Sequence, residues 1–318
     1  MAKQETKERW FREGADSFRR VMVRRRDTQR LAKYENKYPC PLCLDPFPIE
    51  AIADRRLTVE HIPPESVGGS ELLLTCAPCN NKSGTTFDAE ATKVDRLRSL
   101  AKGTHSSAVP AQFSVNGLPV NGDLFIADAN QPDPSAEYEF SIEPQAGGGI
   151  YFAPVERINN PTDFARFDQA WNGLGTAPLR ISFSPRIRVD QARASVSWIR
   201  SAYLAAFAVL GWHYALQEVF EPLRAQLKAD KAATLPDLHY EEPAADRQRR
   251  EILVCEIPGQ TRCIVVAMGP HVVFLPPYLA GRLSLVDVAT AVKQGDGEFT
   301  GVAADWPDSA RYELDRLP

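Results

Sequence analysis

Two closely spaced cysteine pairs limit what this chain can fold into more than any other feature of its sequence. They are Cys40-Pro-Leu-Cys43 and Cys76-Ala-Pro-Cys79. Two residues between cysteines let both thiolates face one tetrahedral site, so two such pairs supply the four sulfurs of a closed zinc shell. Because no coordination position stays open, we expect a structural Zn²⁺ ion that joins two distant segments. The alternative is that the four cysteines are free or disulfide-bonded.

The expected compartment favours metal binding over disulfides. The first ten residues are polar and charged, unlike a secretory signal, and the most apolar run, residues 202–210, is too short to span a bilayer. We therefore expect a cytoplasmic protein with no membrane partner, in surroundings that disfavour structural disulfides. With 44% hydrophobic and 25% charged residues, the chain is typical of folded globular proteins.

Positive charge is concentrated at the N-terminus, although the net charge of the whole chain is −4. An apolar stripe at helical spacing consists of Phe11, Ala15, Phe18 and Met22. This stripe predicts an amphipathic helical arm over residues 1–38. The basic residues of the arm include Arg19, Arg20, Arg24, Arg25, Arg26, Arg30, Lys33 and Lys37. The arm is either a solvated helix packed on the next module or a segment that contacts phosphates.

A second motif lies between the cysteine pairs and continues just after them. Its parts are Glu60-His61-Ile62-Pro63-Pro64, then Gly68-Gly69, then Asn80-Asn81-Lys82 directly after Cys79. An acidic residue before His, then Ile-x-Pro and Gly-Gly, then a cysteine pair followed by Asn and Lys, resembles the HNH endonuclease signature in its zinc-stapled form. The resemblance covers about residues 39–103, a fifth of the chain.

The resemblance implies both a fold and an activity. The fold is a ββα-metal module: a hairpin with strands at about residues 57–61 and 72–75, packed on a helix from about residue 77 to residue 100. The activity is endonucleolytic hydrolysis of phosphodiester bonds, in DNA more than in RNA, with a 5′-phosphate and a 3′-hydroxyl as products.

The chemistry of phosphodiester hydrolysis explains these residue types. A phosphodiester is anionic, so a divalent cation must neutralise charge that develops on its oxygens. Glu60 and Asn80 offer the hard oxygen ligands that Mg²⁺ or Mn²⁺ prefers. Neutral His61, with an ordinary pKa of about 6.5, suits the base that activates water. Because neighbours on a regular strand face opposite ways, Glu60 and His61 share a site only where the strand ends or twists.

Two further residues are candidates for supporting roles. Glu71, five residues before Cys76, stands where the family usually has Asn to hold the catalytic His. Its carboxylate could orient His61 Nδ1–H, or the register is slipped, or the site is weakened. Lys82 is either a phosphate contact or an exposed helix lysine.

Residues 113–318 predict a separate mixed α+β domain. Residues 191–227 favour a helix, and residues 202–210 are apolar on every face, which indicates a buried central helix. Strands are expected at residues 252–257, 262–268 and 271–275, and a final helix at about residues 278–292. His239 and His271 have no ligand-like neighbours, and Cys255 and Cys263 fit buried packing.

The C-terminal half resembles no known family. We expect it to serve target sensing, specificity or regulation through a protein partner or an activating ligand, as in restriction or anti-phage defence. The competing interpretation of the whole chain is a non-catalytic zinc module that binds nucleic acid or a protein.

Overall fold

A computed structural model shows a mixed α+β fold, as predicted. It describes residues 4–101, 109–115, 118–125, 151–153, 165, 169, 181–185, 188–229, 235–257, 261–277, 283–294, 300–304 and 306–310. The chain forms two compact units, one made of Met1–Ala91 and Gln191–Pro318 and the other of Thr92–Asp190. The division into an arm at residues 1–38, a module at 39–103 and a domain at 113–318 stays a prediction.

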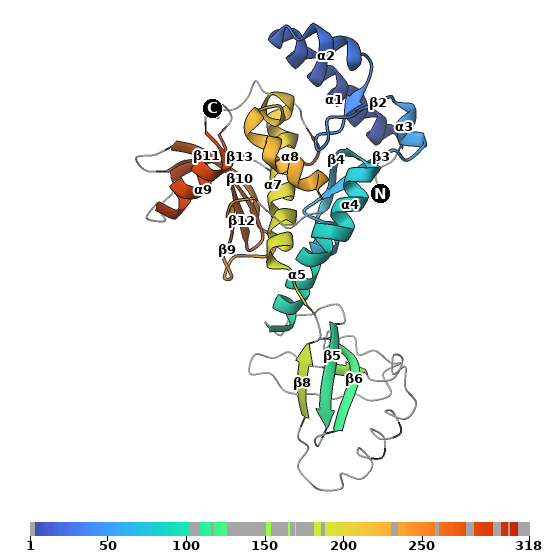
Figure 1. Cartoon of the computed structure of the whole chain (residues 1–318), viewed down its shortest axis with the longest axis vertical. Helices are drawn as coiled ribbons and strands as arrows, with labels where there is room; N and C mark the ends of the chain where they lie inside the picture. The colour runs from blue at the N-terminus through green and yellow to red at the C-terminus, as the bar shows by residue number, and fades with distance from the viewer. Residues whose placement is uncertain are drawn as a thin grey trace. The chain divides into compact units, whose positions relative to one another are not determined.

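The second unit contains an antiparallel four-stranded sheet. Its strands are β5 (Val109–Val115), β6 (Leu118–Phe125), β7 (Tyr151–Ala153) and β8 (Ile181–Pro185), in the order β7-β6-β5-β8 (Figure 1). Every residue that the sequence motifs single out lies in the first unit.

The N-terminal helix α1 (Gln4–Arg25) is amphipathic, as its sequence predicts. Phe11, Phe18 and Met22 are buried, and Ala15 packs against the same core while half-buried. Of the eight basic residues named for the arm above, seven are exposed, namely Arg19, Arg20, Arg24, Arg25, Arg26, Arg30 and Lys33. Short helix α2 (Thr28–Lys33) follows, and its N-cap residue Asp27 accepts a hydrogen bond from Arg30 N–H at 2.9 Å.

The expected hairpin and helix follow in the chain. Two short strands, β1 (Tyr38–Pro39) and β2 (Pro46–Phe47), pair on either side of the first cysteine pair, and helix α3 (Glu50–Ala53) comes next. Strands β3 (Leu57–Ile62) and β4 (Ser70–Cys76) then pair antiparallel. The helical segment begins with α4 (Ala77–Ser83) and ends with α5 (Ala89–Ala101), with the short π-helix η2 (Gly84–Asp88) between them.

The hairpin loop explains the Gly68-Gly69 pair. Gly68 ends the short 3-10 helix η1 (Glu65–Val67) with a φ of 84°, in the left-handed region that favours glycine. A Cβ atom on Gly69 would lie 1.5 Å from the backbone oxygen of Pro63. Only glycine therefore allows the two sides of this loop to approach so closely.

Helix α7 (Gln191–Ala215) is the buried central helix. It packs on α1, on both hairpin strands and on η2, and also on a second sheet (Figure 1). Trp212 Nε1–H donates to Gly14 O at 2.8 Å, which joins α7 to α1. Gly211, with a φ of 68°, breaks the helical geometry near its end. Helix α7 is long and apolar enough to cross a membrane, but 89% of its most apolar stretch is buried in the fold, as in core helices of soluble proteins.

The sheet of the first unit on which α7 packs has five antiparallel strands in the order β13-β10-β11-β12-β9. They are β9 (His239–Glu241), β10 (Arg250–Ile257), β11 (Thr261–Met268), β12 (His271–Leu275) and β13 (Thr300–Ala304). The expected strands correspond to β10, β11 and β12. The remaining elements of this unit are η3 (Glu218–Phe220), α8 (Glu221–Lys228) and α9 (Leu285–Gln294).

Candidate nuclease site and zinc centre

The four cysteines of the two pairs converge. Their Sγ atoms lie within 4.8 Å of one another, and Cys43 Sγ is 3.7 Å from Cys76 Sγ. Sulfurs bound tetrahedrally to one zinc ion at about 2.3 Å are about 3.8 Å apart. Backbone N–H of Cys76 also donates to Cys40 Sγ at 3.3 Å, which stabilises negative charge on that sulfur. The donor set, its spacing and its burial therefore fit a structural zinc ion.

The thiols affect one another's ionisation. A hydrogen bond with the Cys40 thiol lowers the pKa of Cys76, whereas hydrogen bonds with neighbouring thiols, Cys40 first, raise the pKa of Cys79. Four adjacent thiolates repel one another, and a divalent cation is the group that stabilises all of them together.

A β-bulge lies in the hairpin beside the acidic-His motif. Glu60 pairs with Leu73 and His61 with Glu71, so Leu72 is an extra residue in β4. Such a bulge bends β4 and increases the local twist of the hairpin opposite Glu60 and His61. Glu60 is 2% exposed, whereas the His61 side chain is 26% exposed.

Glu71 lies directly opposite His61 on β4. Its Oε1 is 3.9 Å from His61 Nε2, which is an ion-pair distance and longer than a hydrogen bond. The sequence suggests Nδ1 as the nitrogen that Glu71 would orient, but the structure brings the carboxylate to the other ring nitrogen.

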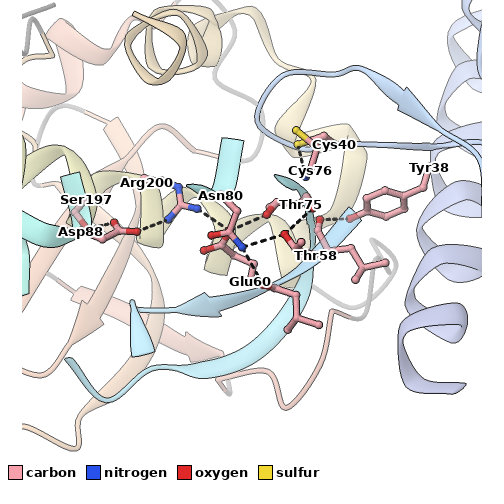
Figure 2. Close-up of polar contacts among 12 residues, drawn as sticks. Tyr38, Cys40, Thr58, Glu60, Thr75, Cys76, Asn80, Asp88, Ser197 and Arg200 are labelled. Atoms are coloured by element: carbon pink, nitrogen blue, oxygen red, sulfur yellow. Dashed lines mark hydrogen bonds and ion pairs between the residues drawn. The ribbon is translucent and has the colours of Figure 1, made fainter. Parts of the chain in front are cut away.

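Glu60 belongs to a buried ionic network that reaches helix α7. Its Oε2 accepts hydrogen bonds from Arg200 Nη2 at 2.6 Å and from Thr75 Oγ1 at 2.8 Å (Figure 2). Arg200 Nη1 also lies 3.5 Å from Asp88 Oδ2, and Asp88 Oδ1 accepts from Ser197 Oγ at 2.5 Å. One fully buried guanidinium therefore lies between two carboxylates.

Burial and charge act in opposite senses within this network. Burial raises the pKa of Glu60, and the attraction of Arg200 only partly offsets that effect. Burial alone would lower the pKa of Arg200, but the carboxylates of Glu60 and Asp88 outweigh it and the net direction is upward. Arg200 is therefore charged, and burial first, with the nearby Asp88 carboxylate as a smaller cause, holds the pKa of Glu60 above its usual range.

Asn80 lies in the first helical turns of α4, against the hairpin. Its Nδ2 donates to Thr58 Oγ1 at 3.1 Å and to Val59 O at 3.0 Å (Figure 2). Both acceptors immediately precede Glu60 in the chain, so the structure places Asn80 beside the acidic-His motif. Since the amide nitrogen is directed to the hairpin, the carbonyl oxygen is the atom of this side chain suited to a cation.

Lys82 reaches the end of helix α8. Its Nζ donates to Lys228 O at 2.7 Å, a backbone oxygen at the C-terminus of that helix. A lysine at this position satisfies a terminal carbonyl and interacts favourably with the helix dipole.

Arg200 and Asp88 were missed by reasoning from the sequence. Residue 200 lies 140 positions from Glu60, and no motif spacing links them. The available signal was an arginine next to the wholly apolar stretch at residues 202–210, because a charge on a buried helix needs a buried partner.

Comparison with known families agrees with this geometry. Residues 40–95 match the HNH endonuclease family model. The matched residues, hereafter the HNH module, include all four cysteines and the motif residues from Glu60 to Lys82. No curated protein and no solved structure matches the chain, and the family match does not extend into the C-terminal half.

Proposed function

We propose that the HNH module is a divalent-cation-dependent endonuclease that hydrolyses phosphodiester bonds, with DNA as the favoured substrate. The family match supports nuclease activity in general. The observation that carries the finer proposal is the position of Asn80, whose amide is anchored on Thr58 and Val59 next to Glu60 and His61. In this proposal the carboxylate, the imidazole and the amide come from one hairpin and the helix that packs on it.

Each residue has a distinct role in this proposal. His61, partly exposed at the bulge, accepts the proton of the attacking water, and Glu71 stabilises the imidazolium that forms. Asn80 Oδ1 and Glu60 hold Mg²⁺ or Mn²⁺. Arg200 and Thr75 both donate to Oε2 of Glu60. In this proposal the other oxygen, Oε1, is therefore the one that would bind the cation. Lys82 Nζ contacts a phosphate only after its hydrogen bond to Lys228 O has broken.

Replacing His61 by alanine tests the proposal. Wild-type protein is expected to cut plasmid DNA with Mg²⁺ or Mn²⁺ and not with a chelator of these ions, in a panel that also contains linear DNA, single-stranded DNA and RNA. His61→Ala should lower the cleavage rate about 10²- to 10⁴-fold, the usual contribution of a general base. Zinc content and circular dichroism should stay unchanged.

Glu65→Gln serves as the matched control, because Glu65 is exposed in the same hairpin loop. It should cut at the wild-type rate. Equal cutting by His61→Ala would remove His61 from the mechanism.

A second candidate function is nucleic-acid binding without cleavage. It is favoured by the Arg200 contact, which already neutralises Glu60, and by the exposed basic face of α1. In that case binding should persist in both Glu60→Ala and His61→Ala. Cleavage of any nucleic acid that depends on Mg²⁺ and on His61 would exclude this alternative.

Both candidate functions predict that α1 contributes to DNA binding in a salt-dependent way. Combining Arg20→Ala with Arg24→Ala is expected to weaken DNA binding and to reduce the slope of log K against log salt by about 0.9 for each phosphate that is no longer neutralised. Fluorescence anisotropy at several salt concentrations measures this. Arg262→Ala removes an exposed charge from β11 and should leave the slope unchanged. Equal slopes in all variants would assign α1 a packing role only.

The C-terminal half is proposed to control the module. The support is physical: α7 delivers Arg200 to Glu60, so a ligand or protein that shifts α7 would alter the cation site. Cytoplasmic location and a role in restriction or anti-phage defence stay predictions.

A further inference from the structure

Strands β9 and β12 bring two histidines and a glutamate together outside the HNH module. His239 and Glu241 are two residues apart on β9, so their side chains leave the same face of the sheet. In the antiparallel register His271 lies opposite Glu241, and His239 lies opposite Val273. All three side chains therefore share one face at the β9 edge of the sheet.

Their coordinating atoms converge closely. His239 Nε2 is 2.9 Å from His271 Nδ1, and His271 Nδ1 is 3.8 Å from Glu241 Oε1. The three atoms lie within 4.8 Å of one another. Two nitrogens bound to one ion at about 2.0–2.1 Å are separated by about 2.9 Å at a right angle and about 3.4 Å at a tetrahedral angle. The two nitrogens are joined by a hydrogen bond at this spacing, and an ion bound by both at about a right angle would replace that bond without moving them apart.

Aromatic packing holds one of the imidazoles in place. Trp198 of α7 stacks on His271 with ring centroids 3.6 Å apart and an interplanar angle of 15°. His271 is also 1% exposed, so its ring has little freedom to turn. Fixed orientation of a ligand lowers the cost of metal binding, because less side-chain freedom is lost.

We propose that His239, Glu241 and His271 bind one divalent transition-metal ion of the Zn²⁺ class, at a site distinct from the four-cysteine centre. Two imidazoles and one carboxylate favour such ions over Mg²⁺ or Ca²⁺, which prefer oxygen alone. The carboxylate compensates part of the ion's charge. Glu241, with a side chain that is 37% exposed, gives the ion a route from solvent and leaves room for water or a ligand to complete the shell.

Metal content and Co²⁺ spectroscopy test the site in the full chain. Protein reconstituted with Co²⁺ should bind two equivalents, one with the intense charge-transfer band of thiolate ligands and one with only the weak bands of nitrogen and oxygen ligands. His239→Gln and His271→Ala should each lose the second equivalent and keep the first. Retention of the thiolate band shows that these variants are folded.

Neighbouring glutamates provide a matched control. Glu241→Gln should weaken the second equivalent, whereas Glu242→Gln, at an exposed residue paired with Arg249, should not. The proposal would be overturned if the wild-type protein bound only one equivalent of Co²⁺. It would also be overturned if both histidine variants still bound the second equivalent. Loss of the second equivalent in Asn80→Ala would overturn it too, because Asn80 is a ligand of the cation proposed for the HNH module and that result would assign the ion there. The outcome is independent of nuclease activity.

Discussion

Loss of zinc from the four-cysteine site is expected to unfold the HNH module. Two-stranded hairpins are marginal on their own, and the zinc ion would join the segment at Cys40 and Cys43 to the end of β4 at Cys76. Zinc binding in small zinc-finger peptides contributes about 10–16 kcal/mol at neutral pH. That exceeds or matches the whole stability of an ordinary domain, about 5–15 kcal/mol.

The measurement is thermal unfolding with metal analysis on the same sample. Cys76→Ser should release one zinc per chain, a strong zinc chelator should release at least that ion, and both treatments should expose the HNH module to limited proteolysis. Cys255→Ser is the matched control, since Cys255 is also a buried cysteine but lies on β10. It should keep its zinc. Unchanged zinc content and melting temperature in Cys76→Ser would disprove the structural role of the cluster.

Replacement of Arg200 by alanine is expected to destabilise the first unit by about 3–5 kcal/mol, the usual cost of removing one partner from a buried ion pair. Arg200 is fully buried, and its removal leaves Glu60 and Asp88 close together without a cation. The melting temperature should fall by about 2–4 °C for each kcal/mol.

A double variant separates the ion pair from simple packing. Combining Arg200→Met with Glu60→Gln removes both charges of this pair, leaves Asp88 as the remaining charge of the network, and should recover part of the stability. Arg249→Ala is the surface control: Arg249 pairs with Glu242 and Glu251 but is partly exposed, so its removal should cost no more than about 1 kcal/mol. Equal destabilisation by the Arg200 and Arg249 substitutions would show that the buried network contributes no more to stability than a surface ion pair.

Local features of the HNH module could be predicted because short-range patterns specify them. The cysteine spacing predicted the cluster, and the resemblance to the HNH signature predicted β3 to within one residue at its end. Counting back from Cys76 put Glu71 where the family usually has the Asn that holds the catalytic His, and in the structure Glu71 pairs with His61. The extra residue at Leu72 was not foreseen, because a bulge depends on packing against neighbours and not on local propensity.

Features that depend on tertiary packing could not be predicted. The Arg200 contact joins residues 140 positions apart, and strand pairing joins His239 to His271 across 32 positions. In the sequence these two histidines had no ligand-like neighbours, and that expectation was wrong because β9 and β12 pair side by side. A sequence pattern that predicts the strands but not their order in the sheet cannot reveal side-chain clusters that form across paired strands.

The first unit is built from two separate parts of the chain that pack together, and this limits how the protein can be shortened. A fragment ending near residue 103 would lose Arg200 from beside Glu60 and Trp212 from beside Phe18, and so would expose a charge and an aromatic core that need the C-terminal half. Residues 92–190, by contrast, are an insertion between two parts that contact each other through Asp88 and Ser197. The part that can be removed is therefore expected to lie between α5 and α7, and a shortened form of the proposed nuclease would join the end of α5 to the start of α7.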